Sequence, residues 1–346
     1  MSSTTTSSFA PRTGVLLVNL GTPESPGTAD VRTYLREFLL DARVIDIPTL
    51  QRQLLVNGII APFRAPKSAK AYKQLWDAET GSPLKHYTLK LRQMLQDRLG
   101  SHFVVRVAMR YQTPSLPLEL RAFKRDGIDN LVVIPLFPQY ASASTGSVAE
   151  AVMREVSKWQ IIPTLRIENR YYDRPDFIKA FAKIARHKLA EKDYEFLLFS
   201  YHGLPQRQIK KGDEYGICQL GACCNQLDGR NAYCYRAQCF HTTRLLLDAL
   251  NWPVEKSATT FQSRLGRDPW IPPYTDEFIK ELAAKGVKRV AVMSPSFVAD
   301  CLETILEIGD EYHEIFTKEG GTDFDLVPSL NNTPEWVEVL ANMVAG

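Results

Sequence analysis

The 346-residue sequence is poor in long apolar runs, in cysteine and in net charge. It contains no stretch of about 18 or more apolar residues, so it predicts no helix that spans a membrane. The first twelve residues, MSSTTTSSFAPR, lack the apolar segment of a secretory signal, and we expect a disordered tail there. The formal charge of +3 is a weak bias and does not favour a nucleic-acid partner.

Two phosphate-binding patterns are also missing. Neither GxxxxGKS/T nor GxGxxG occurs, which argues against a nucleotide site. Because no secretory signal is recognised, we expect a cytoplasmic protein, or one inside an organelle, where thiols stay reduced. Reduced thiols favour metal binding over disulfides wherever cysteines cluster.

The remaining composition is that of a globular protein, with 45% hydrophobic and 23% charged residues and a length that suits two domains. Apolar runs such as Val15–Leu20, typical of buried parallel strands, alternate with segments of helical spacing. This order predicts an α/β fold of two Rossmann-like lobes, each a parallel sheet flanked by helices. The expected parts are a disordered tail at 1–12, an N-terminal lobe at 13–170 and a C-terminal lobe at 171–346.

Two segments interrupt the alternation. Residues 48–75, approximately, are apolar with scattered Arg and Lys. They are either a packed helical excursion or an apolar lip over a pocket, able to touch a membrane surface. The second interruption is a cysteine-rich insert at about 216–239 in the C-terminal lobe.

Loops that follow the strands hold most of the candidate chemical residues. Ligands of such folds bind at the carboxyl ends of the strands. We therefore expect one cleft formed by Arg110, Tyr111, Tyr140, Ser142, Thr145, His202 and Phe297. His202 directly follows the apolar run FLLFSY, and its near-neutral pKa suits proton transfer or metal contact. The alternative role for His202 is to cap its loop by hydrogen bonding.

An acidic helix is predicted after the Phe297 loop, in ADCLETILEIGDEYHE. Steps of four residues from Glu303 to Glu307 would place carboxylates on one face. A solvated face is the plain explanation, but Glu303 lies close to the expected cleft. Carboxylates facing an imidazole would suit a transient divalent ion such as Fe²⁺, or would move protons off a substrate nitrogen.

Six segments occur in the order found in ferrochelatases, the enzymes that insert Fe²⁺ into a porphyrin to make haem. They are LVNLGTPESP, GSPL, FPQYASASTGS, SYHGLPQR, FQSRLGRDPWIPPYTDE and SPSFVADCLETILEI. The sequence therefore resembles the ferrochelatase family from about Gly14 to Trp336. The resemblance implies a chelatase-like fold with a porphyrin cleft between two lobes. It implies protoporphyrin IX or coproporphyrin III and ferrous iron as the substrates.

The resemblance also implies roles for individual residues. His202 matches the pocket histidine, expected to bind metal, to accept pyrrole protons, or both, and Glu303 matches its acidic partner across the cleft. Glu307 continues the acidic path. Cys301 stands where some members have His. The positions that match porphyrin contacts are Leu20, Arg110, Tyr111, Trp270 and Phe297.

Five of the six cysteines lie between residues 218 and 239, spaced C-x4-C-C-x9-C-x4-C. From spacing alone, a disulfide staple, a zinc site, an iron–sulfur site or chance remain possible, although no CxxC pair of a zinc ribbon occurs. Some bacterial ferrochelatases resemble this chain in carrying an internal cysteine-rich segment that holds a [2Fe–2S] cluster. That resemblance implies a cluster with a structural or sensory role, bound by Cys218, Cys223, Cys224 and Cys234, with Cys239 in reserve.

Other functions remain open at this stage. A chelatase for another metal, such as cobalt, would share the fold and a pocket histidine. A non-catalytic porphyrin or haem carrier would not need the pair His202 and Glu303, and an iron–sulfur electron-transfer protein would need a docking face. The expected partners are porphyrin and ferrous iron, without nucleic acid and with possible peripheral membrane contact. The sequence does not indicate an oligomeric state.

Overall fold

The computed structural model describes residues 11–264, 266 and 268–346. The expected disordered tail at 1–12 lies outside the described residues except for its last two, and so do two positions of the FQSRLGRDPW segment. Within the described residues, no helix is long and apolar enough to cross a membrane.

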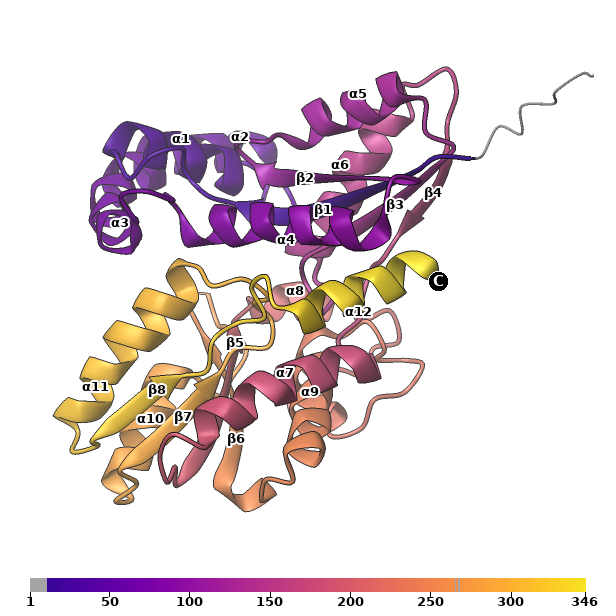
Figure 1. Ribbon diagram of the computed structural model, residues 1–346. Helices are drawn as coiled ribbons and strands as arrows, with labels where there is room; N and C mark the ends of the chain where they lie inside the picture. Colours follow the sequence, from indigo (N-terminus) through magenta and orange to yellow (C-terminus); the bar gives the residue numbers. More distant parts are fainter. Residues whose placement is uncertain (1–10, 265, 267) are drawn as a thin grey trace, which may run out of the picture.

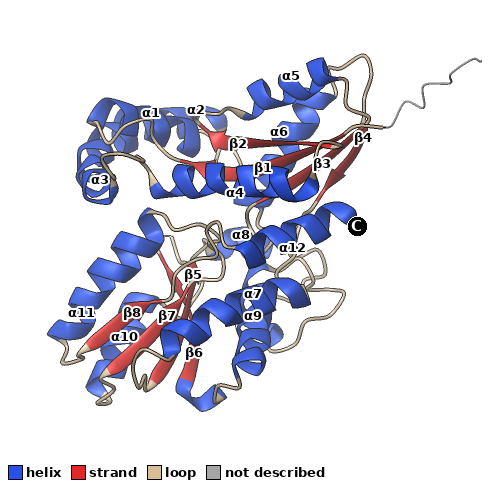
Figure 2. Ribbon diagram, viewed as in Figure 1, coloured by secondary structure: helices blue, strands red, loops and turns tan. Residues whose placement is uncertain are grey.

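Two four-stranded parallel sheets form the framework (Figures 1 and 2). The first sheet has the strand order β2-β1-β3-β4, formed by β1 (Thr13–Gly21), β2 (Phe103–Tyr111), β3 (Asn130–Pro135) and β4 (Thr164–Ile167). The second has the order β6-β5-β7-β8, formed by β5 (Phe196–His202), β6 (Ser257–Gln262), β7 (Arg289–Met293) and β8 (Asp323–Leu326). The predicted α/β fold of two lobes is confirmed.

Helices cover both sheets (Figure 1). Those before β5 are α1 (Thr28–Leu39), α2 (Thr49–Leu54), a π-helix (Leu55–Ile60), α3 (Ala61–Leu75), α4 (Pro83–Leu99), α5 (Leu116–Asp126), a π-helix (Ser142–Gly146), α6 (Ser147–Val156) and α7 (Pro175–Leu189). Those after it are α8 (Gln206–Lys211), a 3₁₀ turn (Ala222–Cys224), α9 (Tyr235–Leu250), a 3₁₀ turn (Val254–Lys256), α10 (Thr275–Ala284), a π-helix (Glu303–Tyr312), α11 (His313–Lys318) and α12 (Pro334–Ala345).

The strands are buried as their apolar sequences predict. Residues 15–18 of β1 are fully buried, because helices cover both faces of a parallel sheet. The core continues from one lobe into the other, since Trp336 of α12 is buried against Tyr171 and Phe177 while α12 packs on α4 of the first lobe. We propose that the lobes divide near residue 170, between β4 and α7.

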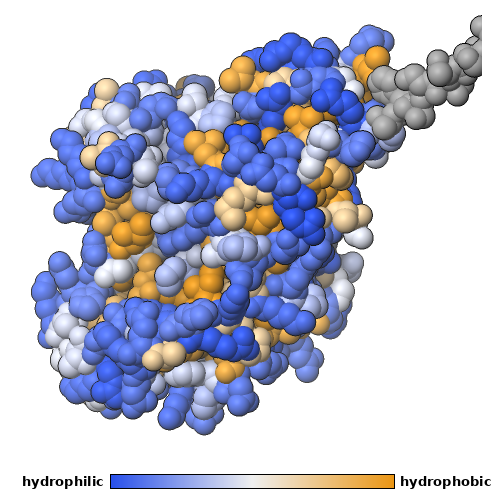
Figure 3. All heavy atoms as spheres, viewed as in Figure 1, coloured by the Kyte–Doolittle hydropathy of each residue, from blue (hydrophilic) through white to orange (hydrophobic). Residues whose placement is uncertain are grey.

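The segment at 48–75 forms α2, a π-helix and α3, which we call the lip. Its inner side packs on α1 and on the acidic helix of the second lobe, with Val56, Ala65 and Tyr72 buried. Its outer side exposes Leu50, Leu54, Ile59 and Phe63. In Figure 3 the outer surfaces of the lobes are mostly hydrophilic, and apolar atoms gather along the seam between them.

Candidate active site

His202 is the last residue of β5 and lies between two aromatic rings. The ring centroids of Trp270 and Phe297 are 6.3 Å and 6.4 Å from the centroid of the imidazole. The Nδ1 atom lies 2.6 Å from the carbonyl oxygen of Gly203. A carbonyl oxygen only accepts hydrogen bonds, so Nδ1 carries a proton, and in the neutral imidazole Nε2 then has a lone pair for a metal ion or a proton.

The strand-end loops are joined so that Trp270 stays beside His202. The backbone amide of Ile271 donates to Leu204 (3.0 Å), and the side-chain amide of Gln206 donates to the carbonyl oxygen of Trp270 (3.0 Å). A Cβ atom on Gly203 would lie 2.8 Å from a backbone oxygen of β6 and 3.1 Å from the Trp270 ring. Glycine is therefore required for this close approach.

The acidic helix differs from its prediction in its winding. Residues Glu303–Tyr312 form a π-helix rather than the expected α-helix. Glu307 accepts hydrogen bonds from Ser263 (2.5 Å) and Tyr312 (2.9 Å) at the carboxyl end of β6. Burial raises the pKa of Glu307, although Ser263 and the charge of His202 act in the opposite direction.

Glu303 faces the first lobe. It lines a cavity of about 20 Å³, large enough for one water molecule, together with Leu20, Gly21, Thr22, Tyr34, Tyr72, Leu75, Ser82, Leu84, Cys301 and Leu302. The charge of Glu303 contributes to the raised pKa of Tyr72 and of Cys301, after the larger effect of burial. The charge of Glu303 also helps to raise the pKa of Glu307, so the two carboxylates act on each other.

The other acidic residues of this segment separate into two groups. Asp310, Glu311 and Glu314 are exposed, as a solvated helix face predicts. Asp300 is buried and accepts hydrogen bonds from Asn331 and from the backbone of Ser329, which makes it a structural residue.

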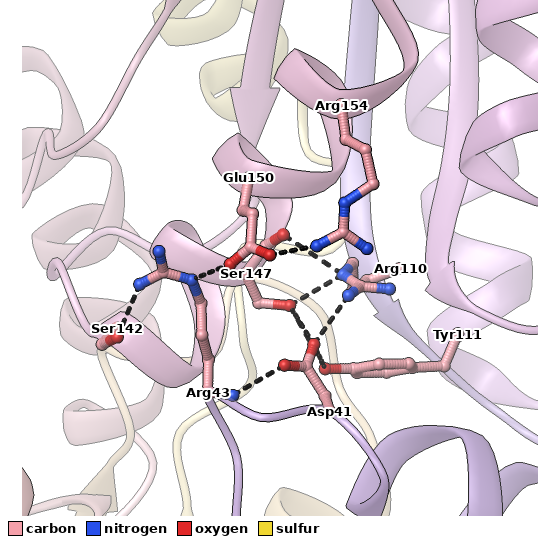
Figure 4. A network of polar contacts seen from close by, with 8 residues as sticks. All are labelled: Asp41, Arg43, Arg110, Tyr111, Ser142, Ser147, Glu150 and Arg154. Atoms are coloured by element: carbon pink, nitrogen blue, oxygen red, sulfur yellow. Dashed lines mark hydrogen bonds and ion pairs between the residues drawn. The ribbon is translucent and has the colours of Figure 1, made fainter. Parts of the chain in front are cut away.

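Arg110 and Tyr111, predicted to contact porphyrin, lie in a polar network at the end of β2 (Figure 4). Asp41 accepts hydrogen bonds from Arg110 (2.6 Å), from the Tyr111 hydroxyl (2.9 Å) and from Ser147 (2.5 Å). Tyr111 is 1% exposed. Its role in porphyrin binding stays a prediction, and its described polar partners are within the protein. Nothing in the sequence near Asp41 indicates partners so far along the chain.

The hydroxyl-rich loop before α6 is also engaged within the protein. Ser142 accepts a hydrogen bond from Arg43 (2.9 Å), Thr145 is fully buried, and the ring of Tyr140 packs edge-on against Tyr233 of the insert at 5.3 Å. Of the seven residues predicted to share one cleft, the ring contacts described here bring together His202 and Phe297.

All six cysteines are free thiols, which excludes the disulfide staple. The Cys223 and Cys224 sulfur atoms lie 4.0 Å apart. A hydrogen bond between Cys224 and Cys234 raises the pKa of the former and lowers that of the latter. Cys239, on α9, is fully buried in the hydrophobic core. Among the described residues, no three or more His, Cys, Asp or Glu side chains are arranged as a metal site.

Comparison with known proteins decides the family. The family model described as ferrochelatase matches residues 12–346. The chain belongs to the ferrochelatase family. The ferrochelatase of Legionella pneumophila strain Philadelphia 1 is 45% identical over 333 residues, covering 96% of this chain and 98% of the relative. The ferrochelatase of Coxiella burnetii strain Dugway 5J108-111 is 42% identical, covering 95% and 92%.

A solved structure extends the comparison to the fold alone. The sirohydrochlorin chelatase SirB from Bacillus subtilis subspecies spizizenii, in complex with cobalt, aligns with a TM-score of 0.54 at 10% identity. The alignment covers 96% of this chain and 94% of that structure. The chelatase-like architecture predicted from the sequence is confirmed for this ferrochelatase family member.

Proposed function

We propose that this ferrochelatase inserts ferrous iron into a porphyrin held against His202, Trp270 and Phe297. Membership of the family makes the protein an enzyme of haem biosynthesis that acts on ferrous iron and a porphyrin. The observation that supports this placement is the imidazole at the end of β5, with two aromatic rings beside it and its Nδ1 atom bonded to the Gly203 carbonyl oxygen. Flat aromatic rings suit contact with a macrocycle.

The reaction exchanges two pyrrole N–H protons for one Fe²⁺ ion. A planar porphyrin resists this exchange because its nitrogen lone pairs point inward, so binding energy must be used to distort the ring. We infer that His202 Nε2 accepts a pyrrole proton or contacts the metal ion. Glu307, whose carboxyl group has a raised pKa, is suited to take protons onward. Glu303, which lines the cavity toward the first lobe, is the acidic partner of His202 that the family resemblance implies, and Glu307 continues the acidic path.

Anaerobic turnover tests the proposal. Purified protein is mixed with Fe²⁺ and either protoporphyrin or coproporphyrin, and the metalloporphyrin spectrum is followed. We expect haem from one of the two, loss of insertion in His202→Ala with porphyrin still bound, and a strong loss in Glu303→Gln. Full turnover by His202→Ala would remove the central claim.

The same assay separates the alternatives. Co²⁺ insertion without Fe²⁺ insertion would point to a chelatase for another metal. Porphyrin binding by folded, reduced protein without any insertion would favour a carrier.

We further propose that the insert holds a [2Fe–2S] cluster through Cys218, Cys223, Cys224 and Cys234. Four thiolates are the ligands of such a cluster, and contacts between neighbouring pairs of these thiols support the assignment. Cys239, which is buried like Cys224, is the reserve ligand. Cys218→Ser should lose visible iron–sulfur absorption while Cys239→Ser keeps it. Stoichiometric zinc with no such absorption would support a zinc site instead.

The exposed face of the lip supports a third proposal, peripheral contact with a membrane. Leu54 and Phe63 are 65% and 76% exposed, and the nearby side chains of Lys67, Lys70 and Lys73 are exposed as well. Apolar and basic side chains on one helical segment suit an anionic lipid surface. Co-sedimentation with anionic vesicles should be weakened by Phe63→Asp, and equal sedimentation of the variant would contradict the proposal.

A further inference from the structure

One short segment holds the two lobes together beside the site. Residues 41–47 connect α1 with α2, and we call them the strap. The strap carries an acidic residue near each end, Asp41 and Asp46, and these two side chains have partners in different lobes.

The first end of the strap is anchored in the N-terminal lobe. Asp41 is held by Arg110, Tyr111 and Ser147, and Arg43 pairs with Glu150 of α6 at 2.5 Å (Figure 4). These contacts hold the start of the strap beside the carboxyl end of β2.

The second end is anchored on α8 of the C-terminal lobe. Asp46, with a side chain 13% exposed, forms an ion pair with Arg207 and a longer one with Lys211 at 3.6 Å. The Gln208 side chain adds a hydrogen bond to the carbonyl oxygen of Val44 (3.1 Å). A mostly buried carboxylate needs such partners, since an unpaired buried charge is costly.

Helix α8 in turn belongs to the surroundings of His202. Gln206, at its first turn, holds the carbonyl oxygen of Trp270, and Arg207 also pairs with Asp268 at 3.2 Å. The guanidinium of Arg207 therefore links the strap with the loop that carries the aromatic neighbour of His202.

The strap also supports the beginning of the lip. Arg52 of α2 is buried and donates to the carbonyl oxygens of Ile45 (3.2 Å) and Ile47 (2.8 Å). From there the lip runs to Tyr72, which lines the Glu303 cavity. A displacement of the strap would thus carry the lip away from the acidic helix.

We propose that Asp46 and Arg207 are positioning residues, whose ion pair latches the strap to α8 and sets the lip over the porphyrin cleft. This inference rests on the proposed function, because it assigns the latch to porphyrin binding at that site. The latch acts through placement and touches no reacting atom. Its loss is expected to weaken porphyrin binding more than the chemical step.

Steady-state kinetics of Asp46→Asn, Arg207→Gln and the double variant test the latch. Each single variant should raise the porphyrin KM about tenfold with kcat within about twofold, and the double variant should be no worse than either, because coupled residues are not additive. Asp46→Glu should restore most of the affinity. Asp268→Asn removes the charge of the second partner of Arg207 and should raise the porphyrin KM less than Asp46→Asn does.

Hydrogen exchange gives a readout that needs no turnover. Amides of residues 48–75 should exchange faster in Asp46→Asn than in the wild type. The matched control is Glu338→Gln, which breaks an ion pair between α12 and Arg98 of α4 (2.6 Å) away from the strap, and it should change neither the lip nor the porphyrin KM.

Three results would overturn the latch: wild-type KM in Asp46→Asn, unchanged lip exchange, or additive effects in the double variant. A wild-type protein without chelatase activity would instead refute the proposed function. The exchange experiment would then still report whether the strap holds the lip.

Discussion

Replacing Asp41 with Asn tests the network that anchors the strap. The substitution keeps the size of the side chain and removes its charge. In the native protein this carboxylate is 8% exposed and accepts hydrogen bonds from Arg110, Tyr111 and Ser147. An Asn side chain would turn an NH₂ donor toward donors and leave Arg110 without its counter-charge.

The size of the loss follows from burial. Removing one partner of a buried ion pair costs about 3–5 kcal/mol, and a hydrogen bond to a charged group contributes about 1.5–3 kcal/mol. The Arg110 side chain is 22% exposed, so water can replace part of what it loses. We expect the free energy of unfolding of Asp41→Asn to fall by about 2–3 kcal/mol at neutral pH.

The effect should depend on pH in a defined direction. Burial acts to raise the pKa of Asp41, but hydrogen bonds from Ser147 and the Arg43 amide, with the charge of Arg110, outweigh it and lower the pKa. A carboxyl group with a lowered folded-state pKa stabilises the fold above its unfolded pKa of about 3.9. That stability is lost as the pH falls through the folded-state pKa. The free energies of unfolding of the wild type and of Asp41→Asn should therefore converge below about pH 4.

Urea unfolding of the wild type and Asp41→Asn at neutral and acidic pH measures the loss of unfolding free energy and its dependence on pH. Glu150→Gln is the control, because its ion pairs with Arg43 and Arg154 are more than a third exposed and should contribute less than about 1 kcal/mol. A loss below about 0.5 kcal/mol in Asp41→Asn, or a difference that does not change with pH, would refute the reasoning.

Three further predictions concern the site itself. Gly21→Ala should lower the free energy of unfolding by more than about 2 kcal/mol, because φ is +117° and a Cβ would lie 2.0 Å from the Tyr111 carbonyl oxygen; an unchanged melting temperature would contradict this. Trp270→Ala should weaken porphyrin binding about tenfold in a fluorescence titration, as expected when an aromatic contact is lost, and equal affinity would argue against stacking. Glu307→Gln should remove a limb of the pH–rate profile on which activity falls as pH drops through the raised pKa of Glu307, and a retained limb would assign it to another group.

Sequence reasoning predicted the framework because the responsible signals are local. Apolar runs such as the one at residues 15–18 are buried under helices on both faces, and their alternation with helical segments fixes two parallel sheets. The placement of His202 and Phe297 followed from the same logic, since His202 ends β5 and Phe297 lies in the loop after β7.

The parts that sequence reasoning missed depend on contacts between distant residues. Asp41 meets Ser147, 106 positions away, and Asp46 meets Arg207 in the other lobe. No local pattern marks either carboxylate. The π-helical winding of Glu303–Tyr312 is a similar case, because the sequence pattern does not distinguish it from an α-helix.

The position of the insert favours a structural role for it. It lies between α8, which holds the strap and the Trp270 loop, and α9, where Tyr235 donates a hydrogen bond to the carbonyl oxygen of His202 (2.9 Å). Just before α9, Tyr233 packs under Arg170 at 4.6 Å. A cross-link among the insert thiols would therefore shorten the free chain between two helices that both support His202. If the proposed cluster forms this cross-link, its loss should loosen the surroundings of His202 before it changes any reacting group.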